Sequence, residues 1–195
     1  MDSRAKILGR VKANKPQVDF NFDLNQFLDM QFDNLVESYQ NSLEANGGTS
    51  LNLSEKGKLE GILLEEVGDK SFVDLTGVIN SKTSFNYEDI DQPKDLADVK
   101  ILVVAGKLGV AENAAIWLDD TILHQVRALP FIVERTIFIL DKNNLVPTMH
   151  HAYQTLGELE SGFGTFIAGP SKTADIEQNL VIGAHGTKSH LVVLV

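Results

Sequence analysis

Short apolar runs alternate along this chain with longer segments in which apolar residues recur at helical spacing. Short runs rich in β-branched and aromatic residues are typical of strands, whereas apolar residues three and four positions apart indicate helices. The predicted strands lie at 50–53, 72–75, 101–105, 115–118, 131–140, 165–168 and 191–195. The predicted helices lie at 1–15, 24–45, 54–67, 119–128, 150–160 and 173–182. Such alternation favours an α/β fold with an open, largely parallel sheet flanked by helices.

The domain organisation follows from the length of the chain and from its first residues. With 195 residues and 43% hydrophobic content, we expect residues 21–195 to form a single α/β domain around one core. Residues 1–20 form an N-terminal arm or short helix, because Pro16 stops a periodic segment whose apolar stripe is thin. The stripe consists of Ala5, Ile7, Leu8 and Val11. It leaves open whether this arm docks on the domain or frays.

The charge balance and the lack of cysteine exclude several classes of partner and cofactor. Lys and Arg number 17 against 27 Asp and Glu, a net charge of -10, which disfavours nucleic acid and anionic membranes because both attract positive charge. The chain has no cysteine and therefore holds no disulfide and no Cys-ligated iron–sulfur cluster. No apolar run approaches the roughly 20 residues of a membrane-spanning helix. We expect a soluble, cytoplasmic protein.

The segment from Gly169 to Glu177 is the strongest candidate for a binding site. A predicted strand runs into a Gly-Pro turn and then into a predicted helix, which would present free backbone N–H groups and a positive dipole end to an anion. Lys172 adds a cation, and two hydroxyls flank it. The expected ligand-binding residues here are Gly169, Pro170, Ser171, Lys172, Thr173, Asp175 and Glu177. The structural alternative is an ordinary helix start, with a hydroxyl cap and acidic residues that complement the dipole.

Three further groups of residues could carry chemistry. His185 and Gly186 follow the predicted helix, and a histidine between small residues can contact a ligand or act as an acid or base, or it can simply cap the helix end. Glu112 is a candidate nucleophile for acyl transfer, or an ordinary carboxylate at a strand edge. His150 and His151 are adjacent and point in different directions on a helix, so we expect surface residues and no metal site.

The last hundred residues resemble the lactate utilisation protein C family, which is built on the LUD domain. The motifs that carry the resemblance are Gly-Pro-Ser-Lys-Thr-Ala-Asp-Ile-Glu at 169–177, Gly-Ala-His-Gly at 183–186, Val-Ala-Glu-Asn at 110–113, Ala-Ile-Trp-Leu at 115–118, and Leu129-Pro130. The resemblance implies the fold of ribose-5-phosphate isomerase, glucosamine-phosphate deaminase and the CoA transferases, with a site at the carboxyl ends of the strands. It also implies a role in oxidising lactate to pyruvate beside partner subunits, one of which carries iron–sulfur clusters.

Two positions depart from the family pattern. Thr187 stands where the family usually has a proline after the His-Gly pair, and Ala114-Ala115 stand where it commonly has Gly-Thr. Loss of that glycine removes easy access to a positive φ, so we expect the loop around Ala114 to bind a different ligand or none.

Three hypotheses for function remain open. In the first, the chain is a non-redox subunit of a lactate-oxidising system that binds a small carboxylate or phosphate-bearing carrier, because it has neither cysteine nor a Gly-x-Gly-x-x-Gly motif with which to move electrons. In the second, it is an enzyme of the same fold class that performs acyl or CoA transfer, or sugar-phosphate isomerisation. In the third, it is a regulatory or assembly protein that senses a metabolite. The candidate catalytic residues are Glu112, Asp175 and His185.

Overall fold

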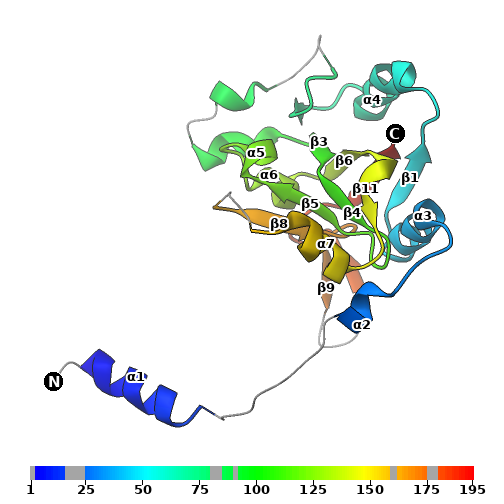
Figure 1. Cartoon of the computed structure of the whole chain (residues 1–195). Coiled ribbons are helices and arrows are strands. Elements are labelled where there is room, and N and C mark those ends of the chain that lie inside the picture. The colour runs from blue at the N-terminus through cyan, green and yellow to red at the C-terminus, as the bar shows by residue number, and fades with distance from the viewer. Residues whose placement is uncertain (1–2, 16–24, 80–84, 90–91, 159–161, 175–179) are drawn as a thin grey trace.

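The computed structural model describes residues 3–15, 25–79, 85–89, 92–158, 162–174 and 180–195 (Figure 1). Its α-helices are α1 (Ser3–Ala13), α2 (Asn25–Leu28), α3 (Leu35–Ala45), α4 (Leu59–Val67), α5 (Asp120–Leu123), α6 (Leu129–Ile132) and α7 (Met149–Leu156). Its strands are β1 (Thr49–Asn52), β2 (Phe72–Asp74), β3 (Ile101–Gly106), β4 (Leu108–Val110), β5 (Ile116–Asp119), β6 (Arg135–Leu140), β7 (Leu145–Val146), β8 (Gly164–Ile167), β9 (Lys172–Ala174), β10 (Leu180–Ile182) and β11 (Ser189–Leu194). Short 3-10 helices lie at Lys56–Lys58, Tyr87–Asp89, Pro93–Asp98 and Lys142–Asn144.

The centre of the molecule is a five-stranded parallel sheet with the order β1-β11-β6-β3-β2. Each neighbouring pair in this sheet is parallel, and Phe138 of β6 lies opposite Val192 of β11 and Val104 of β3. The strands are almost continuously apolar, as expected of parallel strands that are covered on both faces. The predicted α/β fold with a largely parallel sheet is therefore confirmed.

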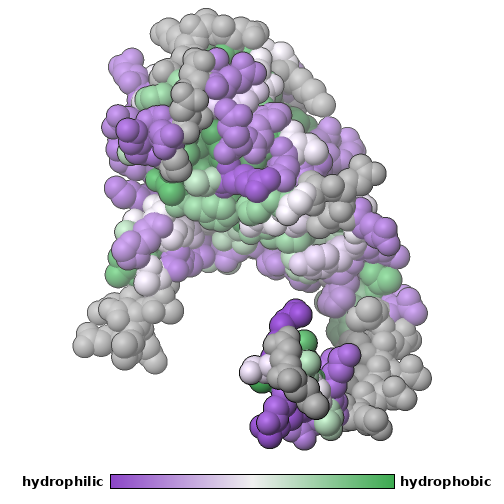
Figure 2. All heavy atoms as spheres, turned by 90° about the vertical axis from the view of Figure 1, so that its left-hand side faces the viewer, coloured by the Kyte–Doolittle hydropathy of each residue, from purple (hydrophilic) through white to green (hydrophobic). Residues whose placement is uncertain are grey.

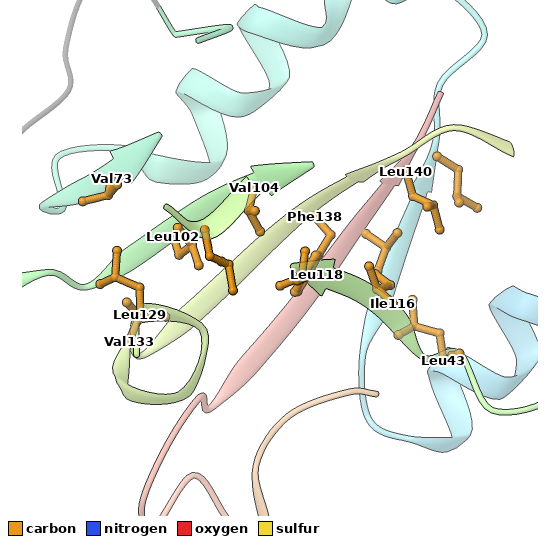
Figure 3. Close-up of a cluster of buried hydrophobic side chains, with 14 of the residues drawn as sticks. Leu43, Val73, Leu102, Val104, Ile116, Leu118, Leu129, Val133, Phe138 and Leu140 are labelled. Carbon is orange, nitrogen blue, oxygen red and sulfur yellow. The ribbon is translucent and has the colours of Figure 1, made fainter. Parts of the chain in front are cut away.

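Two separate cores cover the two faces of this sheet. Along β6, Phe138 and Leu140 point into one core with Leu43 of α3, whereas Ile137 and Ile139 point into the other with Leu63 of α4. Figure 3 shows the first core, where side chains from the central strands meet those from α3, α6 and β5. The alternation follows from the two-residue period of a strand.

A second, four-stranded sheet with the order β7-β4-β5-β8 covers the first core. β4 and β5 are antiparallel, as are β5 and β8, whereas β4 and β7 are parallel. A Cβ atom on Gly109 of β4 would lie 2.5 Å from Leu140 and 2.7 Å from Leu145. Glycine thus lets β4 approach the central sheet. The sequence pattern predicted neither β4 nor β7, because two or three residues are too few to show a period.

Several predicted elements have different bounds in the structure. The helix predicted over 24–45 is two helices, α2 and α3. The second begins where the Asn34 side chain accepts a hydrogen bond from the Glu37 N–H at 3.2 Å. The strand predicted over 131–140 begins at Arg135, because Pro130 stands in the first turn of α6. The helix predicted over 150–160 begins at Met149 and ends at Leu156, where Gly157 takes a φ of 58°.

The helix predicted to begin at Thr173 is wrong. β9 and β10 instead form an antiparallel hairpin, in which Thr173 lies opposite Val181. β-branched residues at both positions favour the extended conformation. The carbonyl of Ser171 also accepts a hydrogen bond from the N–H of Gly183 at 2.8 Å, which extends the pairing beyond the two strands. The segment between the strands, residues 175–179, lies outside the described residues.

α1 stands apart from the domain (Figure 1), and every one of its residues is exposed. Figure 2 shows hydrophilic and hydrophobic side chains together on the surface of this helix. Ile7, Leu8 and Val11 are among the exposed large hydrophobic residues. The predicted N-terminal helix forms, while the division into residues 1–20 and 21–195 stays a prediction. Among the described helices, none has the length and apolar character needed to cross a membrane.

Candidate functional site

The predicted anion-binding turn lies at the amino ends of the parallel strands. The N–H of Ser171 donates to the carbonyl of Thr187 at 2.9 Å, two residues before β11 begins. The N–H of Lys188 in turn donates to the carbonyl of Glu134, the residue before β6. In Figure 1 β9 projects from this end of the sheet, opposite to the C-terminus. The resemblance implied a site at the carboxyl ends of the strands, so this placement differs from that expectation. We call this region the amino-edge site.

Two glycines allow the loops of the amino-edge site to pack closely. Gly169 has a φ of 73°, and a Cβ atom there would lie 2.9 Å from the carbonyl oxygen of Asn46. A Cβ atom on Gly186 would lie 2.9 Å from the carbonyl oxygen of Phe131 and 3.0 Å from Cβ of Ser171. The structure thus brings Gly186 against Ser171, as the prediction of a shared site requires, and both glycines have a packing reason to be there. Pro170 is buried beside them.

Lys172 is the cation of this site. Its exposed ammonium lies 3.5 Å from Oδ1 of Asn46, and the Asn46 amide nitrogen donates to the carbonyl of Asn113 at 2.8 Å. Across the described ranges, no carboxylate lies within ion-pair distance of Lys172, whose recorded partner is a neutral amide. Thr173 is exposed on β9. Asp175 and Glu177 lie outside the described residues.

His185 is exposed in the loop between β10 and β11. The helix that was expected to separate it from Lys172 is a hairpin, so the reason for expecting a helix-capping histidine disappears. Where the structure describes the chain, His185 has no recorded hydrogen bond or ion pair. The predicted contact between its imidazole and the ligand of Lys172 stays a prediction.

Glu112 lies in the loop between β4 and β5, and its carboxylate caps a helix. Oε1 accepts a hydrogen bond from the N–H of Met149, the first residue of α7, at 3.2 Å. A carboxylate at a helix N-terminus satisfies a free N–H and complements the helix dipole. The geometry therefore gives Glu112 a structural task, although the side chain is exposed.

The loop around Ala114 keeps the backbone conformation that a glycine would give it. Ala114 has a φ of 54°, and its carbonyl accepts a hydrogen bond from the Tyr39 hydroxyl at 3.4 Å. The Ser42 hydroxyl and the Asn46 amide of the same helical face donate to the carbonyls of Ala111 and Asn113. These three bonds from α3 and its cap hold the loop in place. Ala114 thus adopts a positive φ without a glycine, and the expectation that this loop binds a different ligand or none stays a prediction.

Thr187, the other departure from the family pattern, is buried. Its hydroxyl donates to the carbonyl of Pro130 at 3.2 Å, and its own carbonyl accepts from Ser171. The hydroxyl links the loop before β11 to α6, which is a contact that a proline could not make.

His190 is a residue of this region that the sequence reasoning missed. It stands in β11, three residues after Thr187, and is 2% exposed. Nδ1 lies 3.1 Å from the Thr136 hydroxyl, and the ring stacks on Phe138 with centroids 4.6 Å apart. Burial, together with the positive charge of Lys172, lowers the pKa of His190 to about 4, so the ring is neutral at pH 7. The signal available in the sequence was a histidine inside an otherwise apolar strand.

A second cation lies at the opposite end of β3, and it is paired. Lys107 Nζ is 2.5 Å from Oδ2 of the buried Asp119, whose other oxygen accepts from Thr121. Although burial opposes ionisation, these hydrogen bonds and the charge of Lys107 hold the pKa of Asp119 below its usual value. A cation already neutralised in this way has less to offer an anionic ligand than Lys172.

No metal-binding constellation is found in the parts of the chain that the structure describes. His150 is exposed and stacks on Phe27. His151 is half-buried, with its ring nitrogens 2.9 Å from the Thr148 hydroxyl and 3.0 Å from the carbonyl of Leu28. The prediction of a surface residue holds for His150, whereas His151 joins α2 to α7.

Comparison with known proteins places the chain in a family. The LUD domain model matches residues 36–195. Lactate utilization protein C of Bacillus pumilus is 42% identical over 90 residues, which is 43% of this chain and 37% of that protein. Lactate utilization protein C of Exiguobacterium is 31% identical over 115 residues, which is 53% of this chain and 49% of that protein. The matched stretches therefore span less than half the length of these relatives.

A solved structure shares the fold. The crystal structure of a DUF162 family protein from Deinococcus radiodurans matches with a TM-score of 0.61 and 16% identity, covering 83% of this chain and 96% of that one. Since the family model covers most of the chain, including the whole of both sheets, this protein belongs to the LUD domain family.

Proposed function

We propose that this chain serves lactate utilisation as a subunit that binds a small carboxylate at the amino-edge site without itself transferring electrons. The similarity to proteins named lactate utilization protein C supports a role in lactate utilisation. The absence of cysteine from the sequence supports a division of labour, because iron–sulfur clusters need thiolate ligands. Electrons from lactate would then pass through cluster-bearing partner subunits, as the resemblance implies.

The observation that carries the proposal is that the Lys172 ammonium has no carboxylate partner among the residues that the structure describes. Two other lysines near this edge have a carboxylate partner: Lys100 lies 3.0 Å and Lys188 lies 3.9 Å from the carboxylate of Glu134. Lys172 lies instead beside the Asn46 amide. A carboxylate would give it a charge-assisted hydrogen bond, which a neutral amide does not supply.

The mode of binding differs from the one that the sequence suggested. With a hairpin in place of a helix, the anion is not held by a helix dipole. It is held by the Lys172 side chain, beside which the Asn46 amide lies. A site of this kind recognises a compact anion such as lactate or pyruvate through few contacts, and a partner subunit can cover its open side.

The test compares two lysines by isothermal titration calorimetry with L-lactate, pyruvate and inorganic phosphate. Lys172→Ala should weaken carboxylate binding by about 1.5–3 kcal/mol, the value of a hydrogen bond to a charged group. Lys188→Ala is the matched control: it removes a cation from the same edge that already faces Glu134, and should leave the affinity unchanged. Equal effects of the two substitutions, or a wild-type protein that binds none of the three anions, would refute the proposal.

A further inference from the structure

We propose that His190 is a ligand-binding residue of the amino-edge site, and that its Nε2 donates a hydrogen bond to the carboxylate held by Lys172. This inference rests on the proposed function, since it concerns the same site. It adds a residue from β11, inside the central sheet, to a site otherwise built from loops and from β9.

The first step is the unsatisfied nitrogen. His190 is 2% exposed, and its Nε2 has no hydrogen-bond partner among the described residues. The neighbouring polar groups are satisfied: the Asn46 amide donates to Asn113, and the Thr187 hydroxyl donates to Pro130. An unpaired buried polar group costs free energy comparable to a lost hydrogen bond. A carboxylate ligand that accepts a hydrogen bond from Nε2 would explain why this nitrogen is left unpaired in the protein alone.

The second step is the orientation of the ring. Nδ1 lies 3.1 Å from the Thr136 hydroxyl, and the ring is stacked on Phe138, so the imidazole is held from two sides. The Thr136 hydroxyl can donate to Nδ1, which leaves the proton of the neutral ring on Nε2. Nε2–H is then a fixed donor, suited to a carboxylate oxygen.

The third step is the position relative to Lys172. The segment from Asn46 to Gly48 lies against both groups: Oδ1 of Asn46 is 3.5 Å from the Lys172 ammonium, and a Cβ atom on Gly48 would lie 3.3 Å from the His190 carbonyl oxygen. The positive charge of Lys172 also helps to lower the pKa of His190, which agrees with this placement. A carboxylate between them would accept from both: one oxygen from the ammonium and the other from Nε2–H. A neutral imidazole donates a directional hydrogen bond to the carboxylate without adding a second positive charge to the site.

The fourth step is that packing alone does not require a histidine here. Val192 and Leu194 continue the same row of β11 side chains into the first core, and both are aliphatic. A leucine at position 190 would extend this row, with no nitrogen left unpaired. A polar residue that the core does not need is a candidate for binding.

The experiment removes the polar pair as a unit. In the double variant Thr136→Val/His190→Leu both partners become apolar, so neither is left unsatisfied and the fold should persist. We expect its affinity for L-lactate or pyruvate, measured by calorimetry, to fall about tenfold or more. His190→Gln, whose amide can donate in place of Nε2, should recover most of that loss. The circular dichroism spectrum and the melting temperature show whether each variant is folded.

A second measurement does not depend on any variant being stable. In the wild-type protein, the ¹⁵N resonance of His190 Nε2 should shift as pyruvate is added, because a new hydrogen bond forms at that atom. Three outcomes overturn the inference. If the double variant binds as the wild type does while Lys172→Ala is impaired, the proposed function survives and His190 is only a core residue. An Nε2 resonance that does not shift at saturating pyruvate also shows that His190 does not contact the ligand, and it leaves the proposed function standing. A wild-type protein that binds none of the anions refutes both proposals.

Discussion

Acidification should destabilise this protein through a single buried side chain, His190. Burial and the charge of Lys172 lower the pKa of this imidazole from 6.5 to about 4 in the folded protein. The unfolded chain therefore takes up a proton at a pH where the folded protein does not. The free energy of unfolding therefore keeps its full value above pH 6.5 and decreases as the pH falls from 6.5 to about 4.

The size of the effect follows from the two pKa values. A difference of about 2.5 units, at 1.36 kcal/mol per unit, gives a loss of about 3 kcal/mol once the pH is below both values. At about pH 5 the loss is about 2 kcal/mol, since the folded protein is still mostly unprotonated there. For a domain of this size, that is a sizeable fraction of the total stability.

Urea unfolding at about pH 7.5 and about pH 5 measures the loss. The control is Thr136→Val/His190→Leu, which removes the imidazole together with its hydroxyl partner. The other titrations are common to both proteins and cancel in the comparison. The pKa values of Asp119 and Glu134 are held below their usual values by neighbouring lysines, so these carboxylates titrate mainly at lower pH. If the variant loses as much stability as the wild type over this interval, the reasoning about His190 is wrong.

Three further predictions concern packing and the loop between β4 and β5. Gly164→Ala should lower the free energy of unfolding by about 1–3 kcal/mol in thermal unfolding, because the new Cβ would lie 2.2 Å from the buried Trp117 ring. Gly61→Ala is the control: this position on α4 faces open space, and the substitution should raise the free energy of unfolding by up to about 1 kcal/mol. Equal effects of the two substitutions would mean that the Trp117 ring can move aside at no cost in stability. Ala114→Gly should change the unfolding free energy by less than about 1 kcal/mol, since relief of the positive φ offsets the lost methyl burial and the added chain entropy; a larger loss would contradict the strained backbone. Glu112→Gln should keep the contact with the first N–H of α7 and leave lactate or pyruvate binding intact, and abolition of an acyl-transfer activity would instead favour Glu112 as a nucleophile.

The central sheet could be predicted from the sequence because each of its strands carries its own signal. The runs that became β3 and β11 are continuously apolar, and no other element is needed to explain their burial. β4 and β7 could not be predicted in this way, because their identity depends on pairing with residues far along the chain, such as Gly109 with Leu145. Non-local pairing leaves no local period.

The geometry around the predicted site residues differs from the one that the sequence suggested, and their role in binding stays a prediction. The order of Gly169, Ser171 and Lys172 after an apolar run suggested a helix start, yet Ser171 uses its backbone to pair with Gly183 and Thr187. The β-branched residues Thr173 and Val181 favour a strand, but the pairing partners of Ser171 lie more than ten residues away in the sequence, so no local pattern showed the hairpin. His190 was missed for a related reason: a histidine in an apolar strand resembles a core residue until the lack of a partner for Nε2 is seen.

The Asn46 side chain gives the amino-edge site a physical link to the second sheet. One end of its amide lies beside the Lys172 ammonium, and the other end donates to the carbonyl of Asn113, next to Ala114. An anion that draws the ammonium away from Oδ1 leaves Asn46 tied to the loop between β4 and β5 alone. The next residue of that loop toward β4, Glu112, caps α7. Three neighbouring contacts thus form a continuous path from the Lys172 ammonium to α7, whose Met149 and Ala152 side chains pack on the second sheet.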